Sequence, residues 1–203
     1  MWSAAILAGG QARRFGGRDK SALVVEGRPI LERQIDELST LTADIMIVGG
    51  QAARSGPSTS LRAGRARLVA DRVPGSGPLA GLHAALIESR GDATIVIACD
   101  MPYVSAPFLR HLLELTRVAD AVVPRTEHGY HPLCAAYTRA CLPAAAARLA
   151  DARLTMAGLF EDVQVRAVTI EEIDAFGDHH RLLANVNTPA EYNALEALQG
   201  HQP

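Results

Sequence analysis

The sequence predicts an α/β fold in which helices flank a mostly parallel sheet. Short apolar runs alternate along the chain with segments of helical periodicity, which is the order that builds a parallel sheet. The chain has 203 residues, 48% of them hydrophobic, and this is enough material for one buried core. No linker is long enough to separate two domains, so we expect a single domain over residues 1–203.

Four apolar runs in the first half have the length of buried strands, and each is followed within two residues by Gly or Asp. The predicted strands are Ala4–Ala8, Ile45–Val48, Leu68–Ala70 and Thr94–Ala98. A helix is predicted to begin at Pro29, because proline suits a first turn. Its apolar face consists of Ile30, Leu31, Ile35 and Leu38. The segment Gln51–Arg67 is typical of an exposed loop, and further helices are expected over Pro78–Arg90 and Ala106–Arg117.

The second half is less regular. Strands are predicted at Ala121–Val123 and Leu133–Tyr137, and an Ala-rich helix at Cys141–Leu149. We expect a helix over Leu154–Asp162 and extended chain over Val163–Ile170. Thr188-Pro189 is typical of a helix start, so a final helix is predicted through Leu198.

Composition excludes several functional classes. The net charge of −2 argues against nucleic acid as the main partner. No apolar run approaches the roughly 18–20 residues that span a bilayer, and Ser3–Ala8 is not followed by a signal-peptide cleavage pattern. Three cysteines, Cys99, Cys134 and Cys141, indicate reduced, buried thiols. We therefore expect a cytoplasmic protein that binds neither nucleic acid nor a membrane.

The loop after the first strand, Gly9–Lys20, has the composition of a phosphate site. Its glycines allow backbone N–H groups to approach a ligand closely, and its three arginines and one lysine supply positive charge. Lys20 is the single lysine among 20 basic residues. The loop lacks both the dinucleotide fingerprint and the Walker A pattern. The alternative is an ordinary Gly-rich surface turn.

Two aspartates follow later strands, where parallel sheets bind their ligands. Asp100 follows the most apolar strand. A carboxylate there costs desolvation energy unless it is paired or binds a metal, and Mg²⁺ beside substrate phosphates is the usual arrangement. The alternative for Asp100 is a helix cap. Asp71 is either functional or a turn former, and Val48-Gly49-Gly50 is either a tight turn or a base contact.

Other candidates carry weaker signals. The loop Pro74–Gly81 is either a substrate lid or a connection, and His131-Pro132 is more typical of a structural turn than of a substrate contact. His179-His180 with Asp178 lacks the spacing of a zinc site, which predicts exposed loop. Asn185 and Asn187 are either caps or polar contacts to a metal shell or phosphate.

Together these motifs resemble the MobA-type molybdenum cofactor guanylyltransferase family of nucleotidyltransferases. The resemblance begins with Leu-Ala-Gly-Gly and Arg-Arg-Phe-Gly-Gly-x-Asp-Lys in the first loop. It continues in order through Gly77–Gly81, Cys99–Tyr103, His131-Pro132 and Asn185–Pro189, and so covers residues 4 to about 198. The first motif alone marks the wider superfamily of sugar-phosphate and cytidylyl transferases. The double glycine, Gly-Pro-Leu-Ala-Gly and Asn-Val-Asn-Thr-Pro narrow it to the guanylyl branch.

The resemblance implies a single Rossmann-like nucleotidyltransferase domain with a mostly parallel mixed sheet. Its nucleotide-binding region is about 1–104 and its pterin-substrate region about 105–198. It implies GTP binding by Leu7, Ala8, Gly9, Lys20, Asp71 and Asp100, with Mg²⁺ on Asp100. It implies catalytic roles for Arg14, Lys20 and Asp100, and substrate binding by Gly17, Gly77, Gly81, Asn185 and Asn187. One departure is Val48, where well-known members carry Asn.

The implied reaction is transfer of GMP from Mg·GTP to the terminal phosphate of Mo-molybdopterin, with release of pyrophosphate. Molybdoenzymes or cofactor-delivery proteins are the implied later partners. One alternative is a related transferase that uses CTP or a sugar phosphate. A second is a nucleotide-binding or cofactor-escort protein without turnover, against which the intact Lys20 and Asp100 argue.

Overall fold

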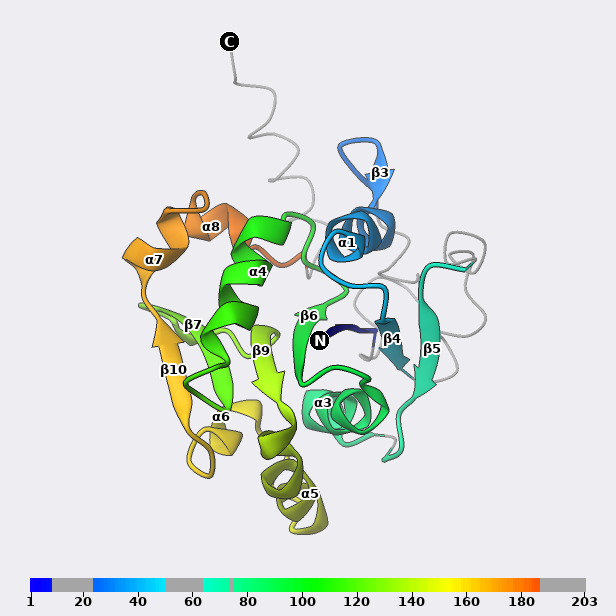
Figure 1. Cartoon of the computed structure of the whole chain (residues 1–203), viewed down its shortest axis with the longest axis vertical. Coiled ribbons are helices and arrows are strands. Elements are labelled where there is room, and N and C mark those ends of the chain that lie inside the picture. The colour runs from blue at the N-terminus through cyan, green and yellow to red at the C-terminus, as the bar shows by residue number, and fades with distance from the viewer. Residues whose placement is uncertain (9–23, 50–63, 74, 187–203) are drawn as a thin grey trace.

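The computed structural model describes residues 1–8, 24–49, 64–73 and 75–186. Over these ranges the chain forms one main sheet covered by helices, together with a two-stranded hairpin (Figure 1). The hairpin pairs β2 (Val24–Val25) with β3 (Arg28–Pro29). The loop Gly9–Lys20 and the helix predicted after Pro189 lie outside the described residues.

The main sheet has the order β10-β7-β9-β6-β1-β4-β5, with β8 paired to β7, and Figure 1 shows this order across the view. The central strands β1 (Trp2–Leu7), β4 (Ile45–Gly49) and β6 (Ala93–Ala98) are neighbours, and β5 (Arg67–Ala70) forms the edge beside β4. The remaining strands are β7 (Ala121–Thr126), β8 (Gly129–Tyr130), β9 (Cys134–Thr138) and β10 (Val165–Val168). β9 runs antiparallel to β6 and β7, whereas β1 is parallel to β4 and β6, and β4 is parallel to β5. The predicted mostly parallel mixed sheet is therefore confirmed.

The central strands β1, β4 and β6 are buried on both faces of the sheet, which explains why they are nearly continuous apolar runs. Successive residues of β1 enter different cores: Ala4 and Ile6 pack into one cluster, and Ala5 and Leu7 into the other. All six residues of β6 are buried. The two cores hold β1 and β6 rigidly, and the site described below lies at their carboxyl ends.

Each face is covered by its own set of helices. Side chains of α1 (Ile30–Ser39), α4 (Ala106–Leu115), α7 (Ile170–Asp174) and α8 (His179–Leu182) enter the first core. Those of α3 (Gly77–Glu88), α5 (Leu142–Ala150) and α6 (Met156–Leu159) enter the second, with the short turn η4 (Arg139–Cys141) before α5. Figure 1 shows α1 and α4 on one side and α3 and α5 on the other.

The C-terminal third departs from the predictions. The helix predicted over Leu154–Asp162 is only the single turn α6, and within Val163–Ile170 only β10 is strand. The extended chain ends because the Thr169 side chain accepts a hydrogen bond from the backbone N–H of Glu172 and begins α7 in a capping box. His179-His180 is not loop but part of α8, because Asp178 caps that turn.

Two smaller corrections concern the first half and the thiols. Pro29 is the last residue of β3 and the N-cap of α1, so the helix starts one residue later than expected. Cys99 is half-buried rather than buried, whereas Cys134 and Cys141 are buried as predicted. Among the described residues, no helix combines the length and the apolarity needed to cross a membrane.

Candidate active site

The carboxyl ends of four neighbouring parallel strands form one edge of the sheet. In spatial order they are the ends of β6, β1, β4 and β5. Asp100 lies two residues after β6, Ala8 and Asp71 directly follow β1 and β5, and Gly49 is the last residue of β4. Three inter-strand spacings of about 4.8 Å separate the ends of β6 and β5, which therefore lie roughly 14 Å apart. A ligand as long as a nucleoside triphosphate can therefore lie along this edge, with a carboxylate near each end.

Asp100 stands in a tight turn directly after β6. The turn is closed by a hydrogen bond from the Met101 N–H to the Ala98 carbonyl (3.4 Å), and the Val186 N–H donates to the Asp100 carbonyl (2.9 Å). The Asp100 residue is half-buried. A half-buried carboxylate at the end of a rigid strand is a suitable oxygen ligand for a hard divalent cation. Asp100 is the described residue best placed to hold a metal at this edge.

Gln34 of α1 also holds the Asp100 turn, and the sequence analysis did not predict this role for Gln34. The Gln34 Nε2 donates to the Ala98 carbonyl (2.8 Å) and to the Met101 carbonyl (2.9 Å), and the side chain is fully buried. The available signal in the sequence was a polar residue one turn from Ile30 and Leu31, on the face predicted to be apolar. Because the two acceptors flank Cys99-Asp100, Gln34 fixes the path of the backbone that carries the carboxylate.

The main-chain groups at the end of β1 are engaged with neighbouring strands. The Leu7 carbonyl accepts from the Cys99 N–H (3.2 Å), and the Ala8 N–H donates to the Val48 carbonyl (2.8 Å). The Val48 side chain is 1% exposed and packs in the core. Val48 therefore contributes its backbone to this edge, and its side chain fills core volume.

The predicted substrate glycines on α3 differ in their surroundings. Gly81 is buried, and an added Cβ would lie 3.3 Å from Cδ1 and Cδ2 of Leu7, so glycine lets α3 approach β1 closely. Gly77 is exposed with φ +70°, in the left-handed region that favours glycine. Asp71 accepts a hydrogen bond from the Val73 N–H (3.0 Å), the turn geometry that was its alternative role.

Residues from the C-terminal half also reach this edge. Asn185 is exposed, and its neighbour Val186 is the residue bonded to the Asp100 carbonyl. His131 lies in a structural turn: its N–H donates to the Pro124 carbonyl (2.9 Å), and its Nε2 lies 2.9 Å from the Thr126 hydroxyl. Burial and then the charge of His128 lower the pKa of His131. The other predicted site residues lie outside the described residues: Gly9, Arg14, Gly17, Lys20 and Asn187.

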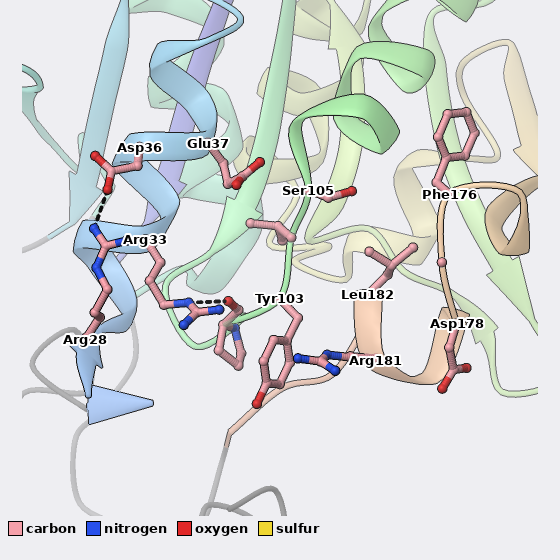
Figure 2. Close-up of a pocket in the computed structure, with 13 residues that line it drawn as sticks. Arg28, Arg33, Asp36, Glu37, Tyr103, Ser105, Phe176, Asp178, Arg181 and Leu182 are labelled. Atoms are coloured by element: carbon pink, nitrogen blue, oxygen red, sulfur yellow. Dashed lines mark hydrogen bonds and ion pairs between the residues drawn. The ribbon is translucent and has the colours of Figure 1, made fainter. Parts of the chain in front are cut away.

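A pocket of about 430 Å³ lies beside the loop that follows Asp100 (Figure 2). Its wall includes the Tyr103 ring, which has the guanidinium of Arg181 4.5 Å and that of Arg33 5.7 Å from its centroid. Both arginines also pair with Glu26, at 2.8 Å for Arg33 and 3.2 Å for Arg181. Because these cations already have carboxylate partners, they brace the loop between α1 and α8.

Comparisons with known proteins show the family to which this chain belongs. Residues 4–165 match the family model of the MobA-like NTP transferase domain. A probable molybdenum cofactor guanylyltransferase of Pelotomaculum thermopropionicum is 35% identical, over 92% of this chain and 87% of that protein. A molybdenum cofactor guanylyltransferase of Desulfosudis oleivorans is 30% identical, over 95% of this chain and 93% of that protein.

A comparison with solved structures finds a protein of the same fold. The crystal structure of molybdopterin-guanine dinucleotide biosynthesis protein A from Archaeoglobus fulgidus superposes with a TM-score of 0.82 at 24% identity and covers 100% of both chains. The sequence matches span nearly the whole length of this chain and of the two relatives. The chain therefore belongs to the MobA-like NTP transferases, as a member of their molybdenum cofactor guanylyltransferase group.

Proposed function

We propose that the protein transfers GMP from GTP to the terminal phosphate of Mo-molybdopterin, giving the guanine dinucleotide cofactor and pyrophosphate. The observation that carries this proposal is the row of strand ends from Asp71 to Asp100, in a chain of this family. In this proposal the nucleoside of GTP lies beside β5 and β4, and its phosphates lie toward β6.

Nucleotide binding is assigned along this row. Leu7, Ala8 and Gly9 would contact the nucleoside through main-chain atoms, and Asp71 would contact it from the outer strand. The Leu7 carbonyl and the Ala8 N–H already bond to neighbouring segments, and these bonds also hold the contacting edge rigid. Arg14 and Lys20, on the loop that follows β1, would neutralise the triphosphate.

A divalent cation is part of the chemistry of this family, and we propose Mg²⁺ held by Asp100. The donor chemistry fits, because Mg²⁺ prefers one or two carboxylates together with substrate phosphates. When bound, the ion supplies charge neutralisation at the α-phosphate and at the leaving pyrophosphate.

The reaction is an in-line displacement at the α-phosphorus of GTP. The terminal phosphate of the pterin is already ionised near neutral pH, so no residue has to act as general base. Both reactants are anions, and the work of this chain is to bring them together against their repulsion. Arg14 and Lys20 supply positive charge, while Gln34 and the β6 turn hold the Asp100 carboxylate in place.

The pterin substrate is assigned to the opposite side of the phosphate end. Residues 105–198 would form this region of the domain, beside residues 1–104, which would bind the nucleotide. The proposed pterin contacts are Asn185 and Asn187 from this region, together with Gly17, Gly77 and Gly81 from residues 1–104. Asn185 lies next to the residue bonded to the Asp100 carbonyl. The product would pass to molybdoenzymes or cofactor-delivery proteins in the cytoplasm.

The test is product analysis with molybdenum cofactor, Mg²⁺ and each of the four nucleoside triphosphates. We expect pyrophosphate and the guanine dinucleotide with GTP, and far lower kcat/KM with ATP and CTP. A base that leaves polar groups unpaired costs about 1–3 kcal/mol for each group. Equal kcat/KM for GTP and CTP would instead favour a cytidylyltransferase, and binding without turnover would favour an escort protein.

A further inference from the structure

A cluster of imidazoles and carboxylates lies away from Asp100, where the β7–β8 turn meets α8. One ligand atom from each of Glu127, His179 and His180 lies within 4.8 Å of the other two. Glu127 comes from the turn after β7, and the two histidines form the first residues of α8. The function proposed above uses none of these side chains.

The imidazole of His179 is held in one orientation. Its Nδ1 lies 2.8 Å from Asp174 Oδ1, and the same oxygen accepts the His179 backbone N–H at 2.9 Å. The His179 side chain is 14% exposed. A carboxylate bonded to Nδ1 leaves the Nε2 lone pair outward, which is the arrangement that supports metal-binding histidines in many proteins.

Glu127 faces several imidazoles at once. Its Oε1 lies 3.3 Å from His128 Nε2. A carboxylate oxygen of Glu127 also belongs to the group of three ligand atoms formed with His179 and His180. The negative charge of this carboxylate would balance part of the charge of a bound cation there.

We propose that Glu127, His179 and His180 form a binding site for a first-row transition-metal cation of the Zn²⁺ type, with Asp174 as the positioning residue. Imidazole ligands favour Zn²⁺, Ni²⁺, Co²⁺ or Cu²⁺ over Mg²⁺. Ligand atoms about 2.1 Å from such an ion lie at most roughly 4.2 Å apart. Glu127 and His180 are exposed, so small side-chain rotations close the set, and water completes the coordination.

Occupation of this site would connect two regions of the fold. The ion would join the β7–β8 turn to α8. On its other side α8 contacts the Asp100 loop, because Arg181 lies over the Tyr103 ring. The chain after α8 then reaches the Asp100 carbonyl through Val186. Metal binding is thus expected to stabilise the C-terminal side of the candidate active site, whichever reaction that site performs.

The test is a competition titration of tag-free protein with Zn²⁺ and a chromogenic chelator. We expect one Zn²⁺ per chain and a rise in melting temperature on binding. His180→Ala and Glu127→Gln should lose both effects. Asp174→Asn should weaken binding about 10–100-fold, as loss of a supporting carboxylate does. His83→Ala on α3 is the matched control and should bind like the unmodified protein.

Two further variants separate this site from other possible ones. Asp100→Asn and Cys99→Ala should keep the Zn²⁺ affinity, because both residues lie at the other site. Circular dichroism of each metal-free variant checks that it is folded. The proposal is overturned if the unmodified protein binds no Zn²⁺, if His83→Ala loses as much affinity as His180→Ala, or if binding disappears in Asp100→Asn.

Discussion

At the scale of single residues, the candidate site depends on one carboxylate and on the residue that holds its backbone. Asp100 occupies the position where a charge is useful, and Gln34 reaches it from a different element. The two residues make separable contributions, because Asp100 would act through its charge and Gln34 acts through hydrogen bonds to carbonyls.

Asp100→Asn is expected to remove most Mg²⁺-dependent activity and to leave the fold intact. The substitution keeps the size of the side chain and removes the charge, which should cost several kcal/mol of transition-state stabilisation. Steady-state pyrophosphate release and thermal unfolding are the measurements. Asp92→Asn, at an exposed residue paired with the N-terminal amine, is the control. Near-normal turnover of Asp100→Asn at ordinary Mg²⁺ would make Asp100 a structural residue only.

Gln34→Met is expected to lower both stability and kcat. Methionine fills the same volume, but the carbonyls of Ala98 and Met101 lose their hydrogen bonds from Nε2, and Ala98 keeps the longer one from the Met101 N–H (3.4 Å). Burying unpaired polar groups costs about 1–3 kcal/mol each. Urea unfolding and steady-state kinetics measure the two effects, with the exposed Gln164→Met as control. If stability falls while kcat stays unchanged, Gln34 does not position the Asp100 turn.

At the scale of elements, the close approach of the chain before β6 to the start of β1 sets the packing of the central strands. The N–H of Gly91 donates to the Ser3 hydroxyl (2.8 Å), so the two segments are directly bonded. An added Cβ at Gly91 would lie 2.6 Å from the Trp2 carbonyl carbon and 2.7 Å from the Met1 carbonyl oxygen. These are backbone atoms, which cannot move without shifting β1.

Gly91→Ala is therefore expected to destabilise the protein by about 1–3 kcal/mol, the usual cost of overpacking. Gly81→Ala is the comparison. There the new methyl meets only the end of the Leu7 side chain, and replacing a helix-interior glycine gains about 0.5–1 kcal/mol. Urea denaturation of both variants should give a clearly larger loss for Gly91→Ala. Equal losses would show that the Gly91 backbone contact is not rigid.

At the scale of the whole molecule, Asp44 joins three segments at the sheet edge that lies opposite the candidate site. Its carboxylate accepts hydrogen bonds from Ser3 of β1 (2.6 Å), Arg67 of β5 (3.0 Å) and the backbone N–H of Arg90 before β6 (3.0 Å). Its side chain is 8% exposed. Burial alone would raise the pKa of Asp44, but these hydrogen bonds outweigh it and lower the pKa.

The lowered pKa predicts a stability contribution with a definite pH dependence. The ionised carboxylate stabilises the fold above the unfolded-state pKa of about 3.9, and this contribution is lost as pH falls through the lower folded-state value. Asp44→Asn should lower the free energy of unfolding at pH 7 by about 1.5–3 kcal/mol. Its stability should also fall less steeply below about pH 4 than that of the unmodified protein.

Urea unfolding between acidic and neutral pH measures this difference. Glu114→Gln, at an exposed position on α4, is the control and should follow the unmodified protein. If Asp44→Asn keeps the acid dependence of the unmodified chain, other carboxylates are responsible for acid unfolding.

The amino-acid sequence was enough to locate the central strands and to place Asp100 at the end of one of them. Strands buried on both faces are nearly continuous apolar runs. Ala4–Ala8 and Thr94–Ala98 could therefore be predicted as strands without knowing which strands lie beside them. The family resemblance rests on motifs that are likewise contiguous in the chain. Boundaries and types were wrong where single-turn helices begin at local caps, as at Thr169 and Asp178.

Which distant residues meet could be learned only from the folded chain. Gln34 lies 64 residues from the Ala98 carbonyl that it binds, and nothing in the helical pattern around it states that partner. His179 and His180 lack the sequence spacing of a metal site because the third proposed ligand, Glu127, lies much earlier in the chain, in the turn between β7 and β8. Local sequence patterns indicate which residues are buried and where helices and strands lie. Contacts between separate elements depend instead on how the whole sheet and its helices pack, and that packing brought these side chains together.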